Sequence, residues 1–254
     1  MTLTEQLPAY SQSEYMGHTR YDFKIGDNAC VIVEPNCSLP GKRWVWKAMF
    51  FEAFPVFNQV MLDRGWWVAF MDVGNTFGCP DAMKRFDVFH QQMTGTYSFH
   101  QKPILEGLSR GGLYVYNWAA KNTNKVGMIF GDNPVCDFKS WPGGKGSGLG
   151  STNDWKLLFE CYDFQSEEEA LAWPGNPVDC LEPLVEAGIP LVHSFGDADP
   201  VVPWEENTGV MAKRVNALGG QIKLFRKPGC QHHPHGPADP GTFVDWVLAN
   251  TLNS

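Results

Sequence analysis

The chain of 254 residues is 43% apolar and 19% charged, as is typical of a globular protein with a large core, and its length fits a single α/β domain over 1–254. A net charge of −8 argues against nucleic acid or an anionic membrane surface as a partner. No apolar run approaches the length of a membrane span, and the polar segment 1–21 lacks the pattern of a signal peptide. We therefore expect a cytoplasmic protein, or a periplasmic or secreted one if a leader was removed.

Strand and helix patterns alternate along the first hundred residues. Two strands around a Gly-Asp turn predict an antiparallel hairpin. The strand at 66–71 is continuously apolar, like the strands of a parallel sheet that is covered on both faces. The predicted elements are, in order, strands at 18–25, 28–35 and 44–50, a helix at 55–64, a strand at 66–71 and a helix at 80–94.

The second half continues this alternation with one interruption. Residues 133–179 are irregular and rich in glycine and aromatic side chains, and such an insertion is typical of a lid or a binding loop. The pattern predicts a three-layer α/β sandwich with a mostly parallel central sheet and a lid insertion after the sixth strand. The predicted elements are strands at 104–105 and 125–130, small helices at 154–161 and 166–173, a strand at 189–195, a helix at 203–218, a strand at 221–226 and a helix at 241–252.

A nucleophile elbow is predicted where the apolar run at 104–105 leads into Gly107-Leu108-Ser109-Arg110-Gly111 and an apolar helix. This is the G-x-S-x-G motif in its strand–turn–helix context. The serine must occupy a strained turn that exposes its hydroxyl, and flanking glycines let the neighbouring backbone pass without a Cβ clash. The N–H of Arg110 then points to where an oxyanion forms.

A serine hydroxyl needs a general base, and the base needs an acid to hold it. Asp199 follows the strand at 189–195, and His232 follows the last strand. Ser109, Asp199 and His232 therefore occur in the order that enzymes with this elbow use. Together they predict a catalytic triad more specifically than any one motif does.

Each of the two partners of the serine has competitors. Asp197 is two residues before Asp199, and Asp132 follows the preceding strand, where some hydrolases place the acid. Asp197 also fits a turn-forming role. His233 competes with His232 as the base, whereas His235 is expected to cap the loop or to contact substrate. His233, His235 and Trp141 are our candidate substrate-binding residues.

The motifs resemble those of the α/β-hydrolase superfamily, in particular serine esterases and prolyl-oligopeptidase-like enzymes. The resemblance rests on Gly196-x-x-Asp199-x-x-Val202-Pro203 and on Gly229-x-x-His232. It is strongest to a bacterial group of proteins assigned as carbohydrate esterases, and it covers nearly the whole chain from Trp44 onward. Segments similar to that group are 44–51, 107–112, 136–144 and 232–235.

A second oxyanion donor is expected from residues 47–50, and we assign Lys47 to the oxyanion hole together with Arg110. Both residues are cationic. They either face solvent or attract an acidic group, such as a uronate, beside the scissile ester. Glucuronoyl esterases resemble this chain in placing an arginine directly after their serine.

A metal or organic cofactor is not expected. Cys230, His232, His233 and His235 resemble a ligand set, but a second Cys/His group is not apparent in the sequence and the serine needs its histidine. Seven cysteines without a C-x-x-C pair indicate a reduced protein more simply than a disulfide framework, although one bridge in an exported protein stays open.

The sequence thus predicts a serine hydrolase that cleaves a carboxylic ester of a small molecule or carbohydrate, with no nucleic-acid or membrane partner. A peptidase or a dienelactone-type hydrolase is the second interpretation. A catalytically silent hydrolase fold that binds a ligand is the third, although an intact Ser-Asp-His set disfavours it.

Overall fold

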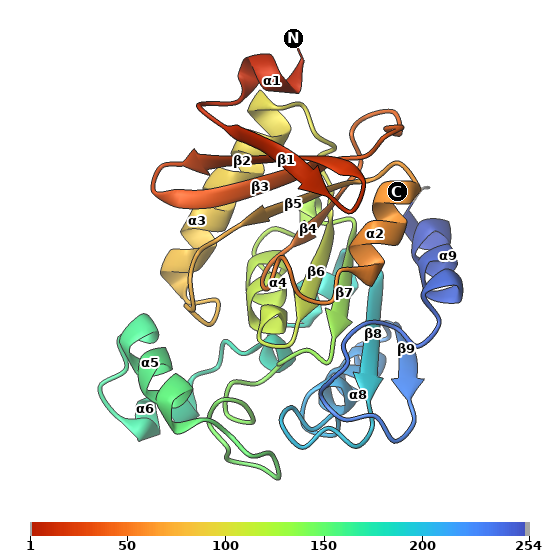
Figure 1. Ribbon diagram of the computed structural model, residues 1–254. Helices are drawn as coiled ribbons and strands as arrows, with labels where there is room; N and C mark the ends of the chain where they lie inside the picture. The colour runs from red at the N-terminus through yellow and green to blue at the C-terminus, as the bar shows by residue number, and fades with distance from the viewer. Residues whose placement is uncertain (1, 252–254) are drawn as a thin grey trace.

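The computed structural model describes residues 2–251. Its centre is a nine-stranded sheet in the order β1-β2-β3-β5-β4-β6-β7-β8-β9 (Figure 1). Pairings from β1 to β3, and between β3 and β5, are antiparallel, whereas all the others are parallel. The strands are β1 (Ser11–Tyr15), β2 (His18–Ile25), β3 (Asn28–Glu34), β4 (Trp44–Lys47), β5 (Trp67–Met71), β6 (Ile104–Leu108), β7 (Met128–Asp132), β8 (Leu191–Gly196) and β9 (Ile222–Lys227).

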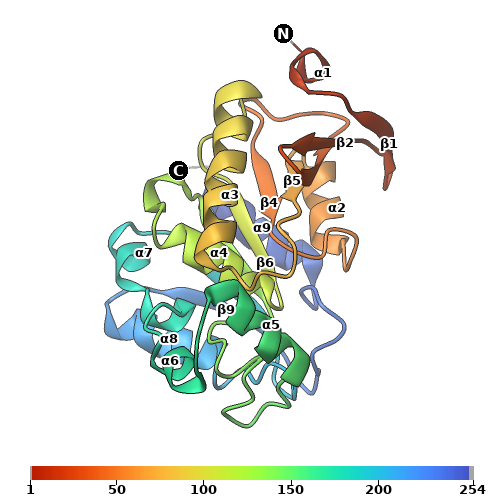
Figure 2. The same cartoon turned by 90° about the vertical axis from the view of Figure 1, so that its left-hand side faces the viewer.

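Helices cover both faces of the sheet, which confirms the predicted three layers (Figures 1 and 2). One face carries α2 and α9, and the other carries α3, α4 and α8. Side chains alternate between them: Val45 packs in the core beside α2 and α9, and Trp46 packs in the core beside α3 and α4. The helices outside the insertion are α1 (Leu3–Gln6), α2 (Val56–Asp63), α3 (Pro80–Gln91) with a π-turn (Gln92–Thr96), α4 (Gly111–Ala119) with a 3-10 turn (Thr123–Lys125), α7 (Glu182–Glu186), α8 (Thr208–Ala217) and α9 (Pro240–Thr251).

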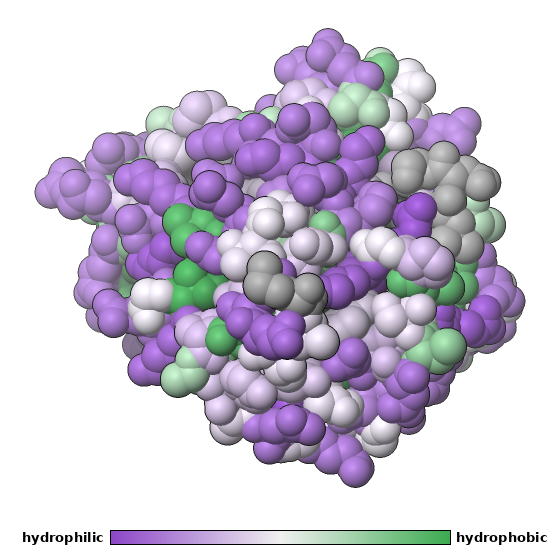
Figure 3. Space-filling model, turned by 90° about the horizontal axis from the view of Figure 1, so that it is seen from above, coloured by the Kyte–Doolittle hydropathy of each residue, from purple (hydrophilic) through white to green (hydrophobic). Residues whose placement is uncertain are grey.

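The N-terminal part contains more structure than the sequence predicted. The hairpin of β2 and β3 is present, but β1 and α1 were not predicted. Most of β1 is exposed and polar, so it lacks the alternation that reveals a half-buried strand. The face that carries these elements is mainly hydrophilic, with small separate hydrophobic patches (Figure 3).

The sheet places the segment after β4 beside β6, the strand that leads to Ser109. β4 lies between β5 and β6 although β5 follows it in the chain, and Lys47 pairs in register with Glu106. The predicted strand 44–50 ends at Lys47 because the chain then turns sharply, with a φ of +56° at Phe50. Residues 48–54 therefore lie at the carboxyl edge of the sheet, next to the end of β6.

The insertion follows β7, and its aromatic side chains form a small core of their own. Rings of Phe138, Tyr162, Phe164 and Trp173 pack against one another at centroid distances of 5.3–6.0 Å. They therefore do not form a row of exposed sugar-stacking faces. The insertion contains α5 (Thr152–Tyr162), α6 (Glu167–Ala172) and a 3-10 turn (Pro177–Asp179). No helix within residues 2–251 is long and apolar enough to cross a membrane.

Candidate active site

A sharp turn joins β6 to α4 and carries Ser109. Its φ is +52°, a left-handed conformation that costs a residue other than glycine about 1–3 kcal/mol and that clusters at functional positions. Neighbouring backbone holds the turn: the Ser109 N–H donates to Asp132 O, and the Val135 N–H donates to Ser109 O, both at 2.9 Å. This is the geometry of a nucleophile elbow.

The glycines around the serine are not equally constrained. A Cβ on Gly107 would lie 2.9 Å from the oxygen of Gly111, and a Cβ on Gly112 would lie 2.5 Å from the oxygen of Val135. A Cβ on Gly111 would meet only Met49, at 3.5 Å. The steric need for glycine therefore falls on Gly107 and Gly112 and not on the second glycine of the G-x-S-x-G motif.

A chain of hydrogen bonds connects Ser109 to a buried carboxylate. Ser109 Oγ lies 3.0 Å from His232 Nε2, and His232 Nδ1 lies 2.6 Å from Asp199 Oδ2. The other oxygen of Asp199 accepts the N–H groups of Val201 (2.8 Å) and Val202 (2.9 Å). Because this turn fixes the carboxylate, the imidazole is held with its Nδ1 proton toward the acid and Nε2 toward the serine.

The two competing carboxylates do not contact His232. Asp197 accepts the Gly229 N–H (2.6 Å) and bonds the Arg226 guanidinium, and that bond lowers the pKa of the Asp197 carboxyl. Asp132 accepts the Gly236 N–H at 2.5 Å. Both side chains brace the loop after β9, and among the candidates only Asp199 is placed to hold the imidazole.

Asn133 is a supporting residue that the sequence did not single out. Its amide nitrogen donates to the His232 carbonyl, and its side-chain oxygen accepts the Gly196 N–H, each at 2.8 Å. Asn133 is buried and has a φ of +42°. It thereby joins the end of β8 to the histidine loop. The available signal was an asparagine directly after a buried strand, at the edge where the site lies.

Ser109 opens into a pocket of about 280 Å³. The pocket combines aromatic and imidazole rings with one cation, and it includes all three residues that we expected to bind substrate. Its lining consists of Phe50, Ala53, Phe54, Leu108, Ser109, Arg110, Trp141, Val201, His232, His233 and His235.

Arg110 presents its guanidinium at this pocket within a ring of aromatic side chains. The guanidinium carbon lies 5.1 Å from the Trp141 ring centre and 5.4 Å from that of Phe50. Nη1 donates to the Asn75 side chain and, at 3.3 Å, to Asp154. The side chain is 20% exposed, so the cation is oriented and still reachable by a ligand.

Lys47 does not line this pocket, and the prediction that its charge faces substrate is wrong. The residue is 0% exposed, and its Nζ donates to Ala53 O (2.7 Å) and to Asn58 Oδ1 (3.0 Å). Glu106 Oε1 lies 3.8 Å away, and burial raises the pKa of the Glu106 carboxyl. A buried ammonium must find such partners because desolvation is costly, so Lys47 braces the loop after β4.

The two remaining histidines lie beside His232, but neither bonds Ser109. His233 stacks on Phe54, with ring centres 5.4 Å apart, and burial together with the neighbouring imidazoles lowers its pKa. His235 is buried, with Nδ1 3.4 Å from Asp132 Oδ2. Only His232, of the three, bonds Ser109.

The insertion contacts the site at a few points. Trp141 is its contribution to the lining of the Ser109 pocket within the described chain, and Asp154 of α5 bonds Arg110. The glycine-rich loop lies against the acid loop, where the Leu149 N–H donates to Pro200 O at 3.0 Å. The insertion thus borders the pocket, and most of it is packed elsewhere.

Comparisons with known proteins identify the fold. No family model and no curated protein matches the sequence. Dipeptidyl peptidase 4 of Porphyromonas gingivalis aligns over 98% of this chain and 36% of its own, with 11% identity and a TM-score of 0.68. Acylaminoacyl peptidase of Pyrococcus horikoshii aligns over 91% and 39%, with 12% identity and a TM-score of 0.66. A candidate lipase of Acinetobacter baumannii aligns over 94% of both chains, with 13% identity and a TM-score of 0.63.

These likenesses and the sheet order show that the chain has the α/β-hydrolase fold. The chain spans little more than a third of the length of the two peptidases. At sequence identities of 11–13%, these likenesses establish the fold but not an activity, because one fold hosts many functions.

Proposed function

We propose that this protein is a serine hydrolase that cleaves a carboxylic ester, with Ser109 as nucleophile, His232 as general base and Asp199 as the orienting acid. The observation that carries this proposal is the unbroken chain of hydrogen bonds from buried Asp199 to the Ser109 hydroxyl. That hydroxyl lies on a strained turn and opens into a pocket. The likeness of the fold to peptidases and a candidate lipase adds support.

The reaction proceeds by acyl transfer. Ser109 Oγ attacks the ester carbonyl while His232 Nε2 takes the hydroxyl proton, and Asp199 stabilises the imidazolium that forms. The same proton passes to the departing alcohol, which leaves an acyl-Ser109. Water then attacks the acyl carbon with His232 again as base, releasing the acid and restoring the hydroxyl.

Two backbone N–H groups are the proposed oxyanion donors. Arg110 is the residue directly before helix α4, and Phe50 lies in the sharp turn after β4. Neither N–H bonds another residue in the part of the chain that the structure describes, and both residues line the pocket. The Ala48 N–H is committed to Glu106 O at 3.0 Å. Phe50 therefore replaces Lys47 in our assignment, and each donor contributes about 10²–10³ in kcat.

The substrate class that we propose is an ester of a carbohydrate or sugar-linked molecule that carries an acidic group. Arg110 is the cation in the lining of the Ser109 pocket, and its side chain stays 20% exposed although it pairs with Asp154. Trp141 lines the same pocket beside Arg110 with 8% of its surface exposed, so it would contribute an edge contact to a sugar rather than an open stacking face. Resemblance of the segments 107–112 and 136–144 to those of bacterial carbohydrate esterases points to the same class. A single charge-assisted contact contributes about 1.5–3 kcal/mol, which is enough to set a preference.

A peptidase is the second candidate, favoured by the likeness to dipeptidyl and acylaminoacyl peptidases. An exopeptidase that binds a free amino terminus requires a carboxylate near the nucleophile. Among the described residues that line the Ser109 pocket, none carries one. This lining argues against an exopeptidase that binds a free amino terminus and leaves other peptidases to the substrate panel below.

Covalent labelling tests the nucleophile. A fluorophosphonate probe should add one label to the native protein, and Ser109→Ala should abolish it while the melting temperature is preserved. Ser147→Ala, which removes an exposed serine of the insertion, is the matched control and should label normally. Labelling that persists in Ser109→Ala would sink the assignment.

A substrate panel tests the reaction class. Methyl uronates, acetylated sugars and p-nitrophenyl esters should be hydrolysed with higher kcat/KM than aminoacyl or dipeptidyl amides of similar size. Faster cleavage of the amides would transfer the proposal to the peptidase. If none of the substrates is hydrolysed but Ser109 is labelled normally, Ser109 remains the nucleophile and the proposed ester substrates are wrong.

A further inference from the structure

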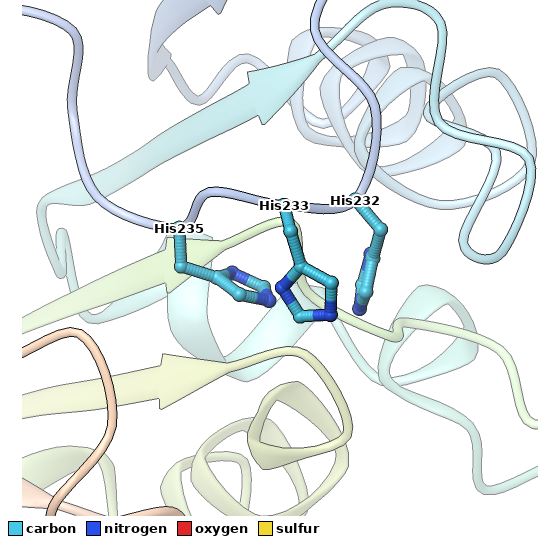
Figure 4. A group of neighbouring side chains, drawn as sticks. All are labelled: His232, His233 and His235. Atoms are coloured by element: carbon cyan, nitrogen blue, oxygen red, sulfur yellow. The ribbon is translucent and has the colours of Figure 1, made fainter.

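Three histidines converge beside the nucleophile, although the mechanism uses one of them. His232, His233 and His235 each present a ring nitrogen, and these atoms lie within 4.8 Å of one another. Figure 4 shows the rings projecting from the loop after β9 toward a common region. Cys230, which the sequence grouped with them, does not belong to this set.

One of the imidazoles is already oriented as a metal ligand is. Asp199 bonds Nδ1 of His232 at 2.6 Å, and a carboxylate behind a histidine fixes the tautomer, so that Nε2 keeps its lone pair and becomes a better ligand. Nδ1 of His235 is buried and has no hydrogen-bond partner among the described residues, and the carboxylate of Asp132 lies 3.4 Å from it. The two carboxylates also supply the negative charge that a divalent cation requires.

The size of the cluster suits a small transition-metal ion after minor adjustment. Zinc binds imidazole nitrogen at about 2.0–2.1 Å, so two nitrogens of a tetrahedral site lie about 3.3 Å apart. His233 is exposed and can rotate, which brings the nitrogens closer than their present spacing. Imidazole suits Zn²⁺ and Cu²⁺, whereas Mg²⁺ and Ca²⁺ prefer oxygen ligands.

We propose that His232, His233 and His235 form a binding site for Zn²⁺ or a similar transition-metal ion, and that the bound ion switches the hydrolase off. His232 Nε2 is the atom that faces Ser109 Oγ, at 3.0 Å. The same lone pair cannot both take the serine proton and ligate a metal. Metal binding therefore excludes activation of the nucleophile, and this inhibitory consequence rests on the proposed function.

The test measures binding and activity separately. Calorimetric titration of Zn²⁺ into the Ser109→Ala protein should show one site per chain, because the three ligands remain; this arm needs no activity. In the Ser109 protein, Zn²⁺ should inhibit p-nitrophenyl acetate hydrolysis with the same affinity. EDTA should restore the rate, and equal concentrations of Mg²⁺ should have no effect. All proteins carry Cys37→Ser to remove an exposed thiol.

His233→Gln should weaken both Zn²⁺ binding and inhibition, relative to its own uninhibited rate, by at least about ten-fold, the lower bound for losses around a metal site. The matched control is His100→Gln, which removes a histidine beside the amino end of β4 and should retain full Zn²⁺ affinity. Unchanged affinity in His233→Gln, binding without inhibition, or activation by Zn²⁺ would each overturn the proposal. If the native protein hydrolyses no ester, the calorimetric arm still decides whether the metal site exists.

Discussion

Lys47 and Arg110 are two cations near Ser109, and the structure places them in opposite surroundings. Lys47 belongs to a sealed network: it is 0% exposed and bonds Ala53 and Asn58. Arg110 belongs to the open site: its side chain is 20% exposed and lines the pocket of Ser109. From the sequence alone, both were expected to lie beside Ser109, either facing solvent or attracting an acidic group.

The difference shows that proximity to Ser109 does not by itself decide what a charged side chain does. A fully buried charge is stabilised by its partners and has no surface left for a ligand. A partly exposed charge, fixed by aromatic rings and hydrogen bonds, can add a contact to substrate at little further entropic cost. We therefore expect changes in the sealed network to alter stability and changes in the open site to alter catalysis.

The largest expected effect is in the open site. His232→Ala should lower kcat by about 10³-fold or more because the serine loses its base, while the free energy of unfolding changes little. His233→Ala, the matched control, should have a much smaller effect, since His233 does not bond Ser109. Steady-state kinetics with p-nitrophenyl acetate measures both, and a larger loss in His233→Ala would mean that the neighbouring imidazole is the base.

Lys47→Met should lower the free energy of unfolding by about 3–5 kcal/mol, because the buried Glu106 carboxylate loses its cation and keeps only the Asn58 amide as partner. Urea unfolding followed by tryptophan fluorescence measures the loss. The double variant Lys47→Met/Glu106→Gln should recover part of it, since the charge is removed together with its partner. If Lys47→Met kept its stability but lost a preference for acidic esters, Lys47 would bind substrate, and the contrast between the two cations would be wrong.

Arg110→Gln should lower the ratio of kcat/KM for a methyl uronate over a neutral ester by about 10–100-fold, which corresponds to one charge-assisted contact. The control is Lys145→Gln, which removes an exposed cation of the insertion and should leave the ratio unchanged. An equal fall for both esters would assign Arg110 to positioning of the pocket rather than to recognition of an acid.

The smallest expected effect concerns His193, another sealed group, whose ring bonds Tyr116 (2.7 Å) and Thr208 (2.9 Å). Burial lowers its pKa from 6.5 to about 3. Between these values the unfolded chain binds the extra proton, so stability should fall as the pH falls below 6.5, by up to about 1.4 kcal/mol per pH unit.

The urea midpoint of the native protein, followed from pH 6 to pH 4.5, should therefore drop more than that of His193→Gln. If that variant does not fold, the His193 ring resonances of the native protein provide the check and should show no protonation above pH 4. Titration of the ring near pH 6 would contradict the sealed environment.

Much of the architecture can be predicted from local patterns in the sequence. The apolar run of β5, the hairpin of β2 and β3 and the strand–turn–helix around Ser109 each follow from side-chain periodicity and turn residues within a few positions. The order of Ser109, Asp199 and His232 along the chain predicted which three side chains would meet. This succeeds because parallel strands bring their carboxyl ends to one edge of the sheet.

Tertiary structure alone decided the surroundings of those residues. Because β4 lies between β5 and β6, Lys47 is buried and Phe50 lies in the pocket lining. Asn133 bonds His232, which is 99 positions away in the sequence. Aromatic residues of the insertion became a local core. β1 was not predicted because most of this edge strand is exposed, so its sequence does not alternate between apolar and polar residues. Burial and hydrogen-bond partners depend on which distant segments pack together, and local sequence patterns do not contain that information.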